Sequence, residues 1–148
     1  MRNDFAVFIL THGRADNVPT YNTLRKQGYA GKIYLIVDDT DEQQDLYKEK
    51  YGDQVVIFNK QTAIDLTDSL DKAVVYARNY SFAIAKELGL KYFLQLDDDY
   101  DVFWNTIDND GKYLTAHKKI KNLDRTFSVV LDFLIGNLKR YCALTRLV

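Results

Sequence analysis

The chain has 148 residues with 20 basic and 21 acidic side chains, and hydrophobic residues make up 47% of it. This composition predicts one globular domain and argues against disorder over the whole chain. A single cysteine, Cys142, excludes an internal disulfide and a cysteine-based zinc site. No apolar run reaches the roughly 20 residues of a membrane-spanning helix, and Met1 is not followed by a signal-peptide pattern. We therefore expect a protein of the cytoplasm with no membrane partner.

Four short apolar runs predict buried strands. Because they lack polar alternation, they fit a parallel sheet that is covered on both faces. Helical segments separate them, and each segment ends at a glycine that is typical of a helix C-terminus. This alternation predicts an α/β fold with a mostly parallel, doubly wound sheet flanked by helices. The strands are expected at 5–10, 32–37, 55–58 and 91–96, and the helices at 18–27, 41–51 and 73–88, the last with an apolar face that includes Phe82.

The pattern changes after residue 100. A strand at 101–104, a turn at 109–111 and a strand at 113–115 predict a hairpin. Apolar residues then recur at helical spacing from Phe127 to Leu138, with Asn122 or Asp124 as a candidate N-cap. We expect one domain over residues 1–148 whose C-terminal part is short or truncated.

Charge is divided unevenly along the chain. Residues 1–111 contain 12 basic and 19 acidic side chains, whereas residues 112–148 contain 8 basic and 2 acidic ones. A basic C-terminal part fits a polyanionic partner, although a solvated basic helix face would produce the same pattern.

Three consecutive carboxylates follow the fourth predicted strand at the edge where open α/β sheets bind ligands. Adjacent carboxylates repel one another, whereas Mg²⁺ or Mn²⁺ would hold them together. In extended backbone Asp97 and Asp99 point to the same side and can share one cation, and Asp98 points the other way. Such ions complete their coordination with phosphate oxygens and water, so the expected ligand is a diphosphate. A solvated acidic turn is the alternative.

Other polar side chains follow the first two predicted strands. Asp38 and Asp39 could accept hydrogen bonds from a ribose or a base, or cap the next helix. Thr11 could bind a base, and Arg14 could neutralise phosphate. Arg78, in the helix before the fourth strand, could offset diphosphate charge or form a surface ion pair.

Several signatures of other enzyme classes are missing. The chain has no Gly-x-Gly-x-x-Gly and no Gly-x-x-x-x-Gly-Lys-Ser/Thr, which argues against a dinucleotide site and excludes a P-loop. It also has no Gly-x-Ser-x-Gly and no convincing Cys–His pair, which argues against nucleophilic hydrolysis.

This arrangement resembles the GT-A class of nucleotide-sugar glycosyltransferases over roughly residues 5–105. More narrowly, it is similar to glycosyltransferase domains of bacteriophages and bacteria that accompany TET-like DNA-base dioxygenases. The segments that carry the resemblance are Phe8-Ile9-Leu10-Thr11 with Arg14, Ile36-Val37-Asp38-Asp39, Ala77-Arg78-Asn79, and Leu96-Asp97-Asp98-Asp99 as the Asp-x-Asp motif.

The resemblance implies a GT-A-like fold and transfer of a sugar from a nucleotide-diphosphate sugar, such as a UDP-sugar. The acceptor it implies is a hydroxyl group on a hydroxymethylated DNA base. Thr11, Arg14 and Asp38 would contact the nucleotide, Asp97 would meet the ribose or the metal, and Asp99 would bind Mn²⁺ or Mg²⁺. No residue between 105 and 148 stands out as the catalytic base. Another metal-dependent nucleotidyl- or phosphoryl-transfer enzyme and a non-catalytic nucleotide-sugar-binding domain are the alternatives.

Overall fold

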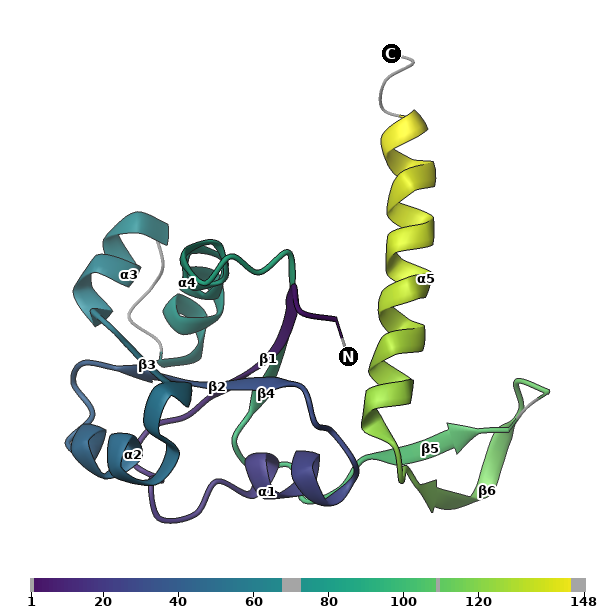
Figure 1. The fold of residues 1–148 in the computed structure, drawn as a ribbon, viewed down its shortest axis with the longest axis horizontal. Coiled ribbons are helices and arrows are strands. Elements are labelled where there is room, and N and C mark those ends of the chain that lie inside the picture. The colour runs from purple at the N-terminus through teal and green to yellow at the C-terminus, as the bar shows by residue number, and fades with distance from the viewer. Residues whose placement is uncertain (1, 68–72, 109, 145–148) are drawn as a thin grey trace.

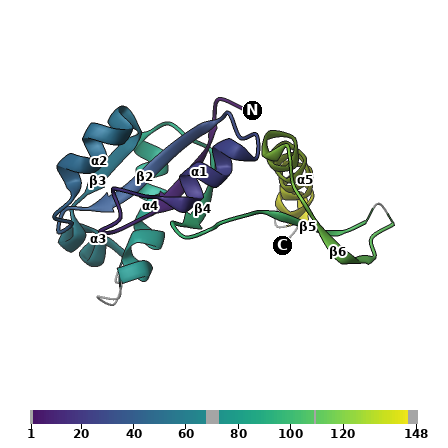
Figure 2. The same ribbon diagram turned by 90° about the horizontal axis from the view of Figure 1, so that it is seen from below.

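The computed structural model describes residues 2–67, 73–108 and 110–144 (Figure 1). A four-stranded sheet with helices on both faces forms the body, and a hairpin and a long helix extend from it (Figures 1 and 2). The elements are β1 (Phe5–Leu10), α1 (Pro19–Lys26), β2 (Lys32–Asp38), α2 (Gln44–Tyr51), a 3₁₀ turn (Gly52–Gln54), β3 (Val55–Phe58), α3 (Lys60–Thr67), α4 (Ala73–Glu87), β4 (Tyr92–Asp97), β5 (Trp104–Ile107), β6 (Tyr113–Lys119) and α5 (Leu123–Leu144).

The main sheet is entirely parallel and has the strand order β3-β2-β1-β4. The predicted α/β fold is therefore confirmed, with a parallel sheet flanked by helices. Sheet order changes direction at β1, because β2 lies on one side of β1 and β4 on the other. The carboxyl ends of β1, β2 and β4 meet there, and this is where ligands bind in such sheets.

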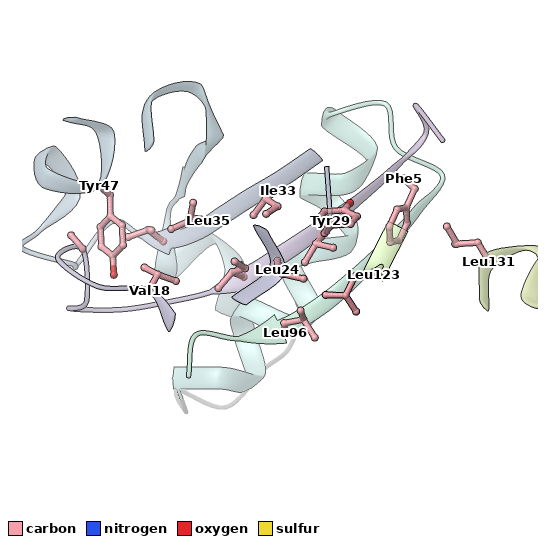
Figure 3. Packing of buried hydrophobic residues seen from close by; sticks show 14 residues of the cluster. Phe5, Val18, Leu24, Tyr29, Ile33, Leu35, Tyr47, Leu96, Leu123 and Leu131 are labelled. Atoms are coloured by element: carbon pink, nitrogen blue, oxygen red, sulfur yellow. The ribbon is translucent and has the colours of Figure 1, made fainter. Parts of the chain in front are cut away.

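Alternating side chains of the central strands supply two hydrophobic clusters, one on each face of the sheet. Val7 and Ile9 of β1 belong to the cluster that includes residues of α1, α2 and α5 (Figure 3). Ala6 and Phe8 point the other way, into the cluster that includes residues of α3 and α4. Burying a side chain such as Phe8 or Ile9 contributes about 1.5–3 kcal/mol, so the absence of polar residues from β1 reflects burial on both faces.

Two features of the body differ from the sequence prediction. Helix α3 was not predicted, because its first residues were interpreted as a polar loop after β3; its first turn is capped by Asn59, whose Oδ1 accepts a hydrogen bond from the Thr62 backbone N–H at 2.7 Å. Phe82 was expected in the buried face of α4, but it is 69% exposed and packs edge-on against Phe93. Ala77 and Ala85 of the predicted face are buried, and Tyr76 and Ile84 are buried beside them.

The C-terminal elements also differ in detail. β5 begins at Trp104 rather than at 101, because Asp101 bonds to Thr23 of α1 and the Phe103 N–H bonds to Gln27, just after α1. β6 is longer than predicted, and Asn109 of the predicted turn lies outside the described residues. Asn122 caps α5, since its Oδ1 accepts a hydrogen bond from the Arg125 backbone N–H at 2.9 Å.

Among the described side chains of α5, those that pack against the body come from its N-terminal part. Leu123 and Leu131 are buried, whereas Val130 and Leu134 of the predicted apolar face remain about half exposed (Figure 1). The side chain of Leu138 lies outside the described part. Among the described residues, no helix has the length and apolar character needed to cross a membrane.

Candidate functional site

A cavity of about 420 Å³ opens at the carboxyl edge of the sheet, between β1, β2 and β4. Five of the residues singled out from the sequence line it, from three different segments: Thr11 and Arg14, Asp38, and Asp97 and Asp98. Arg78 does not line the cavity but contacts Asp97. Asp39 and Asp99 are not among the lining residues, which are Leu10, Thr11, His12, Arg14, Ile36, Asp38, Thr40, Phe58, Lys60, Tyr76, Ala77, Asp97 and Asp98.

Asp98 ends a chain of hydrogen bonds that begins in the loop after β1. The Thr11 hydroxyl donates to Asp98 Oδ2 at 2.8 Å, so the hydrogen bond between Thr11 and Tyr47, at 2.9 Å, is donated by the Tyr47 hydroxyl. Tyr47 in turn accepts from the Arg14 backbone N–H at 2.9 Å. Arg14 Nη1 also lies 3.2 Å from Asp98 Oδ1. Both oxygens of the Asp98 carboxylate are therefore held by residues of, or next to, the first loop.

The loop after β1 is fixed by side chains that follow β2. The Asp41 carboxylate is almost fully buried and accepts a hydrogen bond from the Gly13 backbone N–H at 2.7 Å. The Gln43 side-chain carbonyl accepts from the Ala15 backbone N–H at 2.9 Å. Gly13 has φ +66°, a conformation that favours glycine. These bonds hold the first loop in the conformation that places Thr11 and Arg14 at the cavity.

Asp38 is a buried carboxylate in the wall of the cavity. It accepts hydrogen bonds from the Thr40 backbone N–H at 3.0 Å, the Thr40 hydroxyl and the Tyr76 hydroxyl at 3.1 Å, and His12 Nδ1 lies 3.2 Å away. Burial acts to raise the pKa of Asp38, but the hydrogen bonds from Thr40 and Tyr76 and the nearby His12 outweigh it, so the pKa lies below its usual value. Asp38 is thus a stable anion that can accept hydrogen bonds from a ligand.

Asp97 is paired with an arginine of the neighbouring helix. Arg78 Nη2 lies 2.8 Å and 3.0 Å from the two oxygens of the Asp97 carboxylate. The two side chains are 49% and 42% exposed, so this ion pair is in contact with water and is worth at most about 1 kcal/mol. A stronger ligand for either partner can therefore separate them at low cost.

Asp39 and Asp99 have different environments from the lining carboxylates. Asp39 accepts hydrogen bonds from the Lys60 backbone N–H at 2.9 Å and the Asn59 side-chain amide at 2.5 Å, and so it stabilises the start of α3. Asp39 therefore stabilises a helix start, as the alternative interpretation of this residue proposed. The helix is α3, however, and not the next helix along the chain. Asp99 is exposed, two residues beyond Asp97 in the loop that follows β4.

The donor set was tested for its fit to a divalent cation. Among the described residues, no three His, Cys, Asp or Glu side chains surround a common position, so a cation would not have a complete protein cage. Mg²⁺ and Mn²⁺ do not require one, because one or two carboxylates with phosphate oxygens and water complete their coordination. Asp97, which is partly exposed at the cavity, and Asp99, which is exposed two residues farther along in the turn after β4, supply carboxylates of this kind. The residues present therefore fit such an ion bound together with a diphosphate.

Several site residues were missed or given little weight in the sequence analysis. Lys60 and Tyr76 line the cavity, and Tyr47 and Asp41 hold its first loop from behind. The tyrosines were missed because an aromatic residue at helical spacing is normally core, and each of these rings is indeed buried while its hydroxyl reaches the site. His12 gave a weak signal as a lone histidine, yet its ring nitrogen contacts Asp38.

Comparison with protein-family models identified the family of the chain. A family model described as TET-Associated Glycosyltransferase matches residues 5–145 and so includes every residue that lines the cavity. Searches of curated proteins and of solved structures found no match.

Proposed function

The chain belongs to the TET-associated glycosyltransferase family, and from this premise we propose that it transfers a sugar from a UDP-sugar to a hydroxymethylated base of DNA in a reaction that depends on Mn²⁺ or Mg²⁺. Family membership makes the chain a glycosyltransferase, and such enzymes use a nucleotide-sugar donor. The metal, the uridine nucleotide and the DNA acceptor are the parts that we propose here.

One observation carries the proposal. Thr11, Arg14, Asp38, Asp97 and Asp98, which are far apart in the sequence, line a single cavity at the carboxyl edge of a parallel sheet. The cavity combines hydrogen-bond acceptors for a nucleoside with cationic groups for phosphates, and it lies where the strand order changes direction. Its volume of about 420 Å³ is of the size that small-molecule sites commonly have.

We assign the nucleoside to the part of the cavity around Asp38. The carboxylate is oriented by Thr40 and Tyr76 and carries a negative charge at neutral pH, so it can accept hydrogen bonds from ribose hydroxyls or a base N–H. The Thr11 hydroxyl already donates its one proton to Asp98. Thr11 therefore acts mainly by holding Asp98 and the first loop.

We assign the diphosphate to the part of the cavity around Arg14 and Asp97, which Arg78 contacts from outside the lining. Each guanidinium is paired with a carboxylate, Arg14 with Asp98 at 3.2 Å and Arg78 with Asp97 at 2.8 Å. Asp97 and Asp99 would hold the divalent cation, which stabilises negative charge on the departing nucleoside diphosphate. Once Asp97 is engaged in this way, Arg78 is free to bind a phosphate oxygen.

Calorimetry with UDP tests this assignment. We expect UDP to bind with Mn²⁺ present and to bind much more weakly without it. Asp99→Ala should weaken the Mn²⁺-dependent binding by about tenfold or more, as losses around metal ligands typically do. Asp101→Ala is the matched control, because this exposed carboxylate is two residues farther along and its contact to α1 is made by its backbone carbonyl. Equal UDP affinity with and without Mn²⁺, or equal effects of the two variants, would refute the metal assignment.

Transfer is tested separately. Wild-type protein is incubated with a UDP-sugar, Mn²⁺ and an oligonucleotide that contains 5-hydroxymethylcytosine, and the oligonucleotide mass is measured. An added hexose mass with this oligonucleotide, and none with the unmodified one, is the expected result. If UDP binds but no hydroxymethylated oligonucleotide gains mass with any UDP-sugar, the acceptor assignment is wrong while the donor site stands.

A further inference from the structure

The β5–β6 hairpin is the part of the described chain that has least contact with a core. Its two strands pair with each other and form a sheet separate from the four-stranded one, and the hairpin extends away from the body (Figures 1 and 2). Most of its residues are exposed, so neither face of the hairpin is covered. A two-stranded hairpin on its own is marginally stable in water, which makes such an exposed ribbon a poor structural element and a good candidate for binding a partner.

The hairpin presents apolar rings together with cations. The register pairs Trp104 with Lys119 and Ile107 with Tyr113, so the two side chains of each pair lie next to each other, and a register shift separates the two pairs. Trp104, Ile107 and Tyr113 are 49%, 43% and 84% exposed, which is unusual for three large side chains on one short ribbon. We call these four residues the ribbon face.

The hairpin is also locally basic in a chain whose first 111 residues are acidic. Lys112, Lys118, Lys119 and Lys121 are all exposed, and none of them forms an ion pair with a described residue. The nearby Asp108 is occupied in the turn, where its carboxylate accepts hydrogen bonds from two backbone N–H groups at 2.9 Å. Lysine is depleted from protein–protein interfaces, whereas lysine beside exposed aromatic rings is typical of surfaces that bind a nucleic acid strand.

We propose that the ribbon face binds a single strand or an unpaired stretch of the acceptor nucleic acid. Bases stack on Trp104 and Tyr113, and Lys118 and Lys119 neutralise phosphates along the strand. Stacking on exposed rings requires bases that have left the duplex, and an enzyme that modifies a base must also take that base out of the stack. The inference deepens the proposed function and rests on it for the identity of the strand as the acceptor.

Helix α1 connects this face to the cavity. Gln27, fully buried just after α1, donates hydrogen bonds from Nε2 to the carbonyls of Phe103 and Ile120 at 2.9 Å and 2.5 Å and accepts one from the Phe103 N–H at 2.8 Å. These contacts hold both ends of the hairpin. About two turns before Gln27, the Thr20 hydroxyl donates a hydrogen bond to the Asp97 carbonyl at 2.6 Å. This bond holds the end of β4, where the acidic loop of the cavity begins. Helix α1 and the residue after it thus hold both the ends of the hairpin and the loop after β4.

Fluorescence anisotropy with a labelled oligothymidylate, its duplex with oligoadenylate, and a salt series tests this proposal on the full chain. The combined variant Trp104→Ala and Tyr113→Ala should weaken single-strand binding by about tenfold to hundredfold. The combined variant Lys118→Ala and Lys119→Ala should reduce the slope of log K against log salt by about 1 to 2. A control with Lys48→Ala and Lys86→Ala removes two exposed lysines from α2 and α4 and should bind as wild type does.

Two measurements separate binding from folding and from the donor site. Trp104→Phe retains an aromatic ring and should recover most of the affinity, and every variant should keep the wild-type urea midpoint and UDP–Mn²⁺ affinity. The proposal is overturned if the aromatic variant binds oligothymidylate as wild type does, if the duplex binds more tightly than the single strand, or if the control lysines matter equally. Absence of UDP–Mn²⁺ binding in a wild-type protein that still binds the oligonucleotide would instead refute the donor assignment and leave the ribbon face standing.

Discussion

Replacing Thr11 with valine tests whether the hydrogen-bond chain behind the cavity holds the site together. Valine is close to threonine in shape, so the change removes the hydroxyl and leaves the packing nearly intact. The hydroxyl is buried and lies between two partners: it donates to Asp98 Oδ2 at 2.8 Å and accepts from the Tyr47 hydroxyl at 2.9 Å. After the change, Tyr47 still accepts from the Arg14 backbone but has no acceptor for its own proton.

The expected cost can be worked from these two bonds. A hydrogen bond to a charged group contributes about 1.5–3 kcal/mol, and an ordinary one about 1 kcal/mol. The bond from Thr11 to Asp98 lies at the low end of its range, because the Asp98 side chain is 15% exposed and still has Arg14 at 3.2 Å after the change. We therefore expect Thr11→Val to lower the free energy of unfolding by about 2 kcal/mol, a large share of the 5–15 kcal/mol typical of a domain.

Urea unfolding followed by circular dichroism measures this change, with Thr11→Ser as the matched control. Serine keeps the hydroxyl and loses only a methyl group, so it should cost clearly less than valine. Combining Thr11→Val with Tyr47→Phe should cost less than the sum of the two single changes, because both remove the same bond. The result that would refute a stabilising role of the hydrogen-bond chain is a free energy of unfolding for Thr11→Val within about 0.5 kcal/mol of wild type, together with a larger loss for Thr11→Ser.

Two further outcomes follow from backbone and charge. Gly28→Ala should cost more than Gly89→Ala, because both glycines have positive φ (+81° and +66°) but only the Cβ added at Gly28 meets the Lys121 carbonyl, at 2.8 Å; the difference in urea midpoint measures this. The folded pKa of Asp38 is lowered, so its stabilisation is complete above the unfolded pKa and is lost as pH falls through the folded pKa. The free energy of unfolding of Asp38→Asn should therefore be lower than that of wild type near pH 6, and it should fall less than that of wild type between about pH 5 and pH 3. Equal losses of stability in the two proteins over this pH range would contradict the prediction.

Continuous apolar runs located the strands well. β1 and β3 have the predicted bounds, β2 is one residue longer at its end, and β4 is shifted by one residue at both ends, because a strand buried on both faces has no polar position within it that would obscure its limits. The residues after β4 were interpreted as extended, since Val102, Phe103 and Trp104 have high strand propensity. Thr23 and Gln27 form hydrogen bonds with Asp101 and Phe103, and these bonds replace strand pairing in the first part of this segment. Local sequence does not reveal hydrogen bonds between residues some 80 positions apart.

The order of strand and loop predicted which side chains would meet at the cavity but not what they would do there. Thr11, Asp38 and Asp97 were chosen because each ends or follows a strand at the carboxyl edge, and all three line the cavity. The partners of these residues came from helices, where Tyr47 and Tyr76 look like core residues in a sequence. Hydrogen bonding by a buried ring depends on its exact packing, so this information becomes visible only in the folded chain.

The free protein already neutralises most of the acidic groups that suggested a cation. Asp98 is held by Thr11 and Arg14 and Asp97 by Arg78, so the repulsion among neighbouring carboxylates is relieved by arginines before any ligand binds. The clustering of Asp97 and Asp98 is therefore balanced by contacts within the chain. Asp99 differs, since no described residue forms a hydrogen bond or ion pair with its exposed carboxylate. The contacts of Asp98 account for its position without a ligand, whereas Asp99 has no such contacts, and so the case for metal binding is decided by what happens when Asp99 alone is changed.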